Sequence, residues 1–160
     1  MALKVLNTLK RFVATCLVAL TCTQTSVAGV VVNDTLKSEV LQSDIPFCVY
    51  LPDGFNRNAE QTYPVLYLLH GLTDNERAWT DKGQMERVAD ELMRSGESRK
   101  MVIVMPCAGG QDIHKVWNGY FNMEGWHYED FFFKELMPVV EKEYRAGGSR
   151  EQRAVAGLSM

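Results

Sequence analysis

Two short apolar runs, separated by an amphipathic helical pattern, constrain the fold of this chain most. Residues 65–69 read Val-Leu-Tyr-Leu-Leu after Pro64, and residues 101–105 form a second such run that ends at Pro106. Uncharged runs of this length are typical of strands that are covered on both faces of a parallel sheet. Between them, apolar side chains recur at helical spacing, at Met85, Val88, Ala89, Leu92 and Met93. This order predicts an α/β fold.

The same alternation continues on both sides of this strand–helix–strand unit. Residues 30–32 and 47–51 are predicted as earlier strands, and 154–157 as the start of a later one. Residues 129–144 carry a second helical pattern, in which Pro138 predicts a kink or a break. The expected architecture is a mainly parallel sheet with helices on both faces, within one domain.

The N-terminal segment has the composition of a targeting signal. Its first eleven residues include three basic side chains and no acidic ones. Nine mostly apolar residues follow at 12–20, and the small residues Ser26 and Ala28 end the segment. This pattern predicts a secretory signal peptide over 1–28, which leaves 29–160 as a secreted or periplasmic protein. An apolar run of this length is too short to cross a bilayer, which needs about 20 residues.

Two alternatives to a cleaved signal peptide stay open. The segment could be an ordinary amphipathic helix, or Cys22 could carry a lipid anchor. Thr21 disfavours the anchor, because the residue that precedes a lipid-modified cysteine is usually smaller.

The charge balance excludes several classes of partner. The chain has 17 basic and 20 acidic side chains, a net charge of −3, and 29–160 keeps 14 of the basic ones, which gives −6. Nucleic-acid binding is not expected, because phosphate contacts need clustered Lys and Arg. No attraction to a membrane is expected beyond the signal peptide.

The cysteines and histidines predict neither a metal site nor a cofactor. Cys48 and Cys107 lie outside the first 28 residues, and an oxidising compartment would permit them to pair. Their strand-like surroundings favour two buried small side chains instead, and the pairing stays open. His70, His114 and His127 are too scattered to propose a zinc site.

The chemistry is predicted after the last strand, where the chain reads Gly157-Leu158-Ser159-Met160. This is the opening of the motif G-x-S-x-G, in which a sharp turn lifts a nucleophilic serine hydroxyl clear of the sheet. Glycine is needed two positions before the serine, because a side chain there would clash. The motif predicts Ser159 as the nucleophile and the next N–H, from Met160, as an oxyanion donor. An ordinary serine at a strand end is the alternative for so short a motif.

A second motif favours the nucleophile over that alternative. His70-Gly71 directly follows the strand 65–69, and a loop there can supply another backbone N–H, from Leu72. Two donors that face one oxygen stabilise the charge that develops during acyl transfer. His70 is then expected to shape the loop as a buried, hydrogen-bonded histidine and not to act as the catalytic base.

With these motifs the chain resembles the putative esterase family of the α/β-hydrolase fold. This family includes feruloyl and acetyl-xylan esterases, S-formylglutathione hydrolases and mycolyltransferases. The resemblance covers most of residues 45–160, and its matching stretches are 49–52, 63–71, Trp79, 104–106, 128–144 and 156–160.

The resemblance also carries implications for the site. It implies the roles given above for Ser159, Leu72 and Met160. It further implies that Trp117 and the loop 118–127, which contains Trp126, lie near the substrate cleft. Members often have an acidic or polar residue after the Met-Pro strand end, where this chain has Cys107-Ala108.

The catalytic triad of this fold runs in the order Ser, Asp or Glu, His along the chain. In the sequence, Ser159 is followed by Met160 alone. We therefore expect residues 29–160 to be the N-terminal portion of an esterase domain whose C-terminal part is missing. The fragment by itself is expected to be inactive, because a serine without a base is a poor nucleophile.

Three functional hypotheses follow. The leading one is a secreted serine carboxylic-ester hydrolase that acts on acyl esters of carbohydrates, as feruloyl and acetyl esterases do. The second is acyl transfer to a sugar hydroxyl, which uses the same nucleophile. The third is a non-catalytic carbohydrate-binding or degenerate esterase-like protein that uses the aromatic side chains of 117–128.

Overall fold

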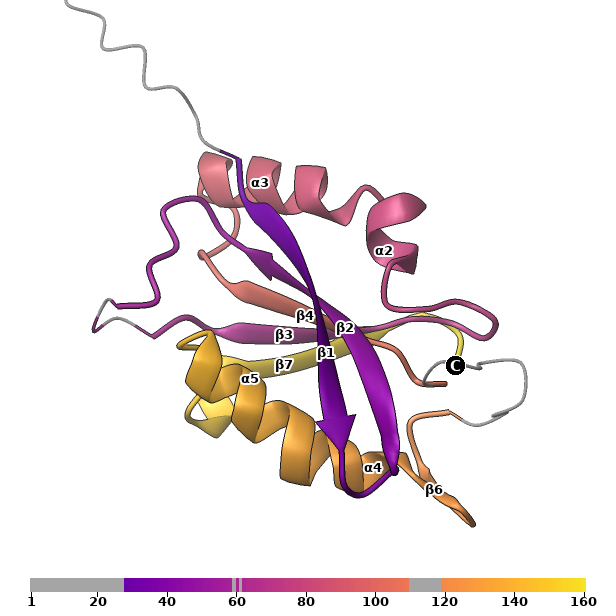
Figure 1. Ribbon diagram of the computed structural model, residues 1–160. Helices are drawn as coiled ribbons and strands as arrows, with labels where there is room; N and C mark the ends of the chain where they lie inside the picture. Colours follow the sequence, from indigo (N-terminus) through magenta and orange to yellow (C-terminus); the bar gives the residue numbers. More distant parts are fainter. Residues whose placement is uncertain (1–27, 59, 61, 110–118) are drawn as a thin grey trace, which may run out of the picture.

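The computed structural model describes residues 28–58, 60, 62–109 and 119–160 (Figure 1). The predicted signal peptide, apart from Ala28, and the predicted cleft residue Trp117 lie outside the described residues. Within the described part of the chain, no helix combines the length and the apolar character needed to cross a bilayer.

A five-stranded sheet in the order β1-β2-β4-β3-β7 forms the centre of the fold. Its strands are β1 (Val30–Ser38), β2 (Ser43–Leu51), β3 (Val65–Leu69), β4 (Val102–Pro106) and β7 (Arg153–Gly157). The strands β4, β3 and β7 are parallel, whereas β1 pairs with β2 and β2 with β4 in antiparallel orientation. The first pair is antiparallel because the short turn 39–42 cannot make the crossover that parallel neighbours need. The predicted α/β fold is confirmed, and the sheet is mixed.

Helices cover both faces of this sheet, as predicted (Figure 1). On one face, the short α2 (Ala78–Asp81) leads into α3 (Met85–Ser95). Met85, Ala89 and Met93 of α3 pack on the sheet, whereas Val88 and Leu92 of the predicted apolar pattern are exposed. On the opposite face, a continuous segment comprises α4 (Tyr128–Phe131), the π-helical η1 (Phe132–Leu136) and α5 (Met137–Glu143).

The irregularity predicted at Pro138 takes the form of this π-helical turn. The N–H of Met137 donates to the carbonyl of Phe132, five residues back, so the backbone ladder widens before α5 begins. Pro138 then lies in the first turn of α5, where a missing N–H is tolerated. The segment still buries Leu136 and Val140 fully against the sheet.

Two small elements complete the structure. A hairpin of β5 (Asn122–Met123) and β6 (Trp126–His127) precedes α4. The 3-10 turn η2 (Arg150–Gln152) precedes β7.

Candidate active site

The three parallel strands end at one edge of the sheet, and the predicted site residues follow two of them. In the pairing of β3 with β7, Leu69 lies opposite Gly157. The loop that begins at His70 and the turn that contains Ser159 therefore leave the sheet side by side. A Cβ built on Gly71 would lie 3.6 Å from the Cβ of Ser159, so the two segments lie close together.

Ser159 occupies a strained backbone conformation. Its φ is 62°, in the left-handed region that non-glycine residues rarely adopt. The N–H of Met160 donates to the carbonyl of Leu158 at 2.6 Å and closes a three-residue turn around the serine. The side chain of Ser159 is exposed. Such strain persists where the surrounding structure imposes it, and it is common at catalytic nucleophiles.

The glycine before the turn is required by the neighbouring strand. A Cβ on Gly157 would lie 3.1 Å from the Cβ of Leu69 and 3.2 Å from its carbonyl oxygen. These separations are shorter than side-chain carbons normally adopt, so a side chain here would press β7 away from β3. The steric conflict that the motif predicts for a side chain at position 157 is therefore with Leu69 of the adjacent strand.

The two predicted oxyanion donors differ in this structure. Within the described residues, the N–H of Leu72 has no hydrogen-bond acceptor, which leaves it available to a ligand. The N–H of Met160 is bonded to Leu158 and would have to release that bond to hold an oxyanion. Both roles stay predictions.

Both ring nitrogens of His70 are engaged by backbone groups of the loops at this edge. Its Nε2 accepts a hydrogen bond from the N–H of Ala108 at 3.0 Å, and its Nδ1 lies 2.8 Å from the carbonyl of Gly71. Since Nε2 is the acceptor, the proton is on Nδ1, which donates to Gly71. Burial lowers the pKa of His70, so the neutral form is favoured. This geometry agrees with the expected loop-shaping role.

Aromatic side chains anchor the loops at this edge through their polar atoms. Tyr120 donates from its hydroxyl to the carbonyl of His70 at 3.0 Å, and Tyr128 to that of Cys107 at 2.9 Å. Trp126 donates from Nε1 to the carbonyl of Ala108 at 3.2 Å. The sequence predicted these residues only as an aromatic cluster, because their backbone partners lie far away in the chain.

This anchoring bears on the carbohydrate-binding alternative. Tyr128 is fully buried and Trp126 is half-buried, whereas Phe121 is 66% exposed. A binding surface for sugars needs several exposed ring faces, and most of the described rings are packed instead.

A shallow cavity of about 170 Å³ lies beside the serine turn. Its lining residues are His70, Gly71, Asp74, Ala78, Trp79, Lys82, Gly83 and Leu158. Trp79 is held there by a hydrogen bond from its Nε1 to the carbonyl of Leu69 at 3.2 Å. The cavity reaches the serine turn only at Leu158.

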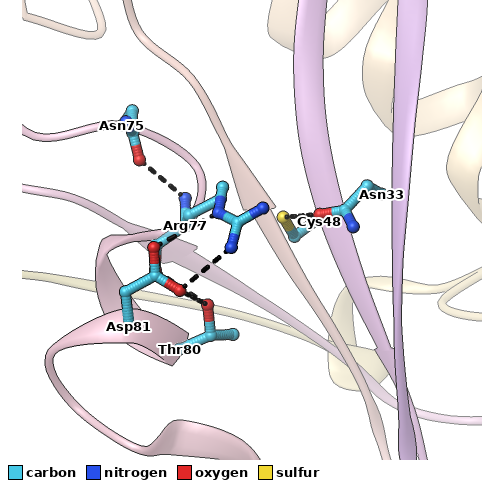
Figure 2. Close-up of polar contacts among 6 residues, drawn as sticks. All are labelled: Asn33, Cys48, Asn75, Arg77, Thr80 and Asp81. Atoms are coloured by element: carbon cyan, nitrogen blue, oxygen red, sulfur yellow. Dashed lines mark hydrogen bonds and ion pairs between the residues drawn. The ribbon is translucent and has the colours of Figure 1, made fainter.

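Cys48 and Cys107 are buried and are not joined in a disulfide. Cys48 donates to the Oδ1 of Asn33 at 3.1 Å, and Figure 2 shows the guanidinium of Arg77 lying toward this thiol while it pairs with Asp81. Cys48 lies opposite Met105 in the sheet, so it is not directly opposed to Cys107.

The mixed sheet, the serine turn and the His-Gly loop at one edge define part of an α/β-hydrolase of the esterase type. Over residues 38–160 the chain matches the family described as Putative esterase, and it belongs to that family.

Several relatives are feruloyl esterases. The chain is 33% identical, over 115 residues, to the endo-1,4-beta-xylanase/feruloyl esterase of Xylanibacter ruminicola, which covers 70% of this chain and 16% of that protein. A second relative is described only as an esterase: the chain is 34% identical over 119 residues to Esterase Rv1288 of Mycobacterium tuberculosis. The match covers 70% of this chain and 23% of that protein.

Solved structures share the fold. A ferulic acid esterase superimposes with a TM-score of 0.78 at 51% identity, covering 83% of this chain and 50% of that chain. The ferulic acid esterase of Anaeromyces mucronatus, solved in complex with ferulic acid, gives a TM-score of 0.70 at 26% identity, covering 88% and 52%. The chain thus spans about half the length of these structures and less than a quarter of the curated relatives above.

Proposed function

We propose that this chain supplies the nucleophile half of a secreted serine carboxylesterase that hydrolyses feruloyl-type esters of carbohydrates. The observation that carries the proposal is the strained Ser159 close beside the Gly71 loop. Membership of the esterase family and the feruloyl esterases among the relatives support the substrate class.

The reaction follows from this arrangement. The hydroxyl oxygen of Ser159 attacks the ester carbonyl carbon, and the negative charge on the carbonyl oxygen is held by backbone N–H groups, with Leu72 the available donor. The carbon–oxygen bond to the sugar breaks, and the sugar leaves with a proton. Water then hydrolyses the acyl-serine and releases the free acid.

The base for this reaction is proposed to lie in a longer form of the protein. Within the described residues, no imidazole or carboxylate is hydrogen-bonded to Ser159, and His70 is already engaged. The acid and histidine of this fold follow the serine in the chain, and the relatives are longer. The 160-residue chain alone is therefore proposed to lack turnover.

Hydrolysis of methyl ferulate and of a feruloylated oligosaccharide by the protein expressed from its whole reading frame tests the proposal. Ser159→Ala should reduce kcat by about a thousandfold or more, as expected for loss of a nucleophile. The matched control is Ser95→Ala at the exposed end of α3. Activity retained by Ser159→Ala would contradict the assignment.

Product analysis separates hydrolysis from acyl transfer. With a feruloyl ester and an excess of free sugar, a hydrolase releases ferulic acid, whereas a transferase forms a new sugar ester. A sugar ester as the main product would contradict hydrolysis and support the transferase hypothesis.

A further inference from the structure

A carboxylate on α3 binds the start of the described part of the chain. The backbone nitrogen of Gly29 donates to Oδ1 of Asp90 at 2.8 Å, across 61 positions of sequence. The hydroxyl of Tyr50 donates to the same oxygen at 2.7 Å. Gly29 and Asp90 are both half-buried, and Tyr50 is fully buried. The carboxylate therefore receives a backbone donor and a side-chain donor at the start of β1.

Only glycine can bring its nitrogen to this place. A Cβ on Gly29 would lie 2.6 Å from both the hydroxyl oxygen and Cζ of Tyr50. The Tyr50 ring cannot move away easily, because it is packed in the core and its hydroxyl is bonded to Asp90.

The sequence places a cleavage motif on the bond just before this nitrogen. Ser26 and Ala28 are the small residues at the two positions that a signal peptidase reads. Hydrolysis of the peptide bond between Ala28 and Gly29 adds one water. Ala28 leaves with a carboxylate, and the nitrogen of Gly29 becomes an α-ammonium group.

We propose that this cleavage creates a docked N-terminus, in which the α-ammonium of Gly29 forms an ion pair with Asp90 and fastens β1 to α3. The inference rests on the secretion proposed above and adds a binding site for the new chain end. A charged donor makes a stronger hydrogen bond to a carboxylate than an amide does. Cleavage therefore strengthens a contact that the uncleaved chain already makes.

The surroundings of Asp90 contain charged side chains of both signs. Beside it lies a cavity of about 80 Å³ with Tyr50, Pro52, Asp53, Asp90, Met93, Arg94 and Lys100 in its walls. Lys100 is engaged by the carbonyl of Asp53 at 2.6 Å. The nitrogen of Gly29 thus approaches Asp90 beside Lys100, a basic neighbour that donates to Asp53.

The first measurement is the N-terminal residue of the protein secreted from its whole reading frame, by intact mass and N-terminal sequencing. The proposal expects Gly29. A lipid-bearing Cys22 or a retained Met1 would overturn it.

The second measurement is the rate at which the α-amine is acylated at pH 7 by an acetyl ester of N-hydroxysuccinimide, followed on the N-terminal peptide. Only the neutral amine reacts, and the Asp90 carboxylate holds it protonated. Asp90→Asn keeps the acceptor oxygen and removes the charge, and it should react about tenfold faster. Glu91→Gln, which removes an exposed charge from the same helix, should react as the wild type does.

A second variant keeps the test decisive if Asp90→Asn fails to fold. Gly29→Ala keeps a small residue after the cleavage site but clashes with Tyr50, and it should also be acylated faster. Equal rates in Gly29→Ala and wild type would overturn the docked N-terminus. Esterase activity measured on the same samples is independent of this outcome, so the two proposals fail separately.

Discussion

The Nε2 of His70 accepts a hydrogen bond from the backbone N–H of Ala108, 3.0 Å away and 38 positions later in the chain. The imidazole thereby links the loop after β3 to the loop after β4. Because Nδ1 must then carry the proton that is donated to Gly71, the link requires the neutral ring. The edge of the sheet at which Ser159 lies is in this way coupled to the protonation of one buried histidine.

The stability of the protein should fall as the pH drops below about 6.5. Burial holds the pKa of His70 below its ordinary value of 6.5, so the unfolded chain takes up a proton at a higher pH than the folded protein does. The stabilisation is full above 6.5 and is lost as the pH falls toward the folded-state pKa. Urea unfolding at pH 7.5 and 5.5 measures this loss.

His70→Gln should flatten this pH dependence while lowering stability at pH 7.5 by about 1–3 kcal/mol, because the amide cannot reproduce both hydrogen bonds. His127→Gln, on the exposed face of β6, is the matched control and should keep the wild-type pH dependence. Identical pH dependence in His70→Gln and wild type would contradict the role of His70.

Gly157→Ala should destabilise the protein by about 1–3 kcal/mol, because the added carbon would press on Leu69 and force β7 away from β3. The same displacement moves Ser159, so esterase activity should fall as well. Thermal unfolding and ester hydrolysis measure the two effects. Ala154→Ser, an exposed change on the same strand, should leave stability and activity near the wild-type values. A Gly157→Ala variant as stable as the wild type would contradict the close approach of the two strands.

Glu141→Gln should cost about 2 kcal/mol of stability, because it removes the charge from a network that holds the start of β7. Glu141 accepts from Arg153 at 2.5 and 2.7 Å, from Tyr67 at 3.3 Å and from the N–H of Gly148 at 3.1 Å. Burial opposes its ionisation, but these hydrogen bonds outweigh burial and hold the pKa of Glu141 below its ordinary value.

Chemical denaturation at pH 7 measures the effect of Glu141→Gln. Glu143→Gln, on the exposed side of α5, is the control and should be neutral. Equal losses in the two variants would show that the network contributes nothing specific.

Cys48 and Cys107 should resist alkylation in the folded protein. Burial raises the pKa of each thiol to about 11, so almost no thiolate is present at pH 8. Iodoacetamide labelling, resolved by peptide mass, should be about 100-fold slower than in urea for both residues. Fast labelling of either one in the native protein would contradict the buried environment.

The hydrophobic pattern was a reliable guide where the apolar side chains of a segment pack in the core. The run 65–69 coincides with β3, and the helical pattern from Met85 to Met93 lies within α3. The strand predicted at 30–32 extends to Ser38, and its later part was missed because most of these residues are polar. Such residues join a strand through backbone pairing with β2, which leaves no hydrophobic signal.

The start of β2 was missed for a different reason. Pro46 argues against a central strand, because proline has no N–H to donate. In the structure the carbonyl of Pro46 accepts from the N–H of Cys107 at 3.0 Å, so the residue pairs through its acceptor alone. The hairpin of β5 and β6 was also missed, since each strand has only two residues.

The local order of residues was sufficient for the α/β class, for the glycine before Ser159 and for the loop at His70, because each depends on spacing within a few positions. The contacts that give these residues their surroundings were not predictable in this way. Ala108 reaches His70 across 38 positions, and Asp90 reaches Gly29 across 61. Periodicity reports which face of a segment is buried, whereas these partners meet only when separate segments pack, and that packing brought donor and acceptor together.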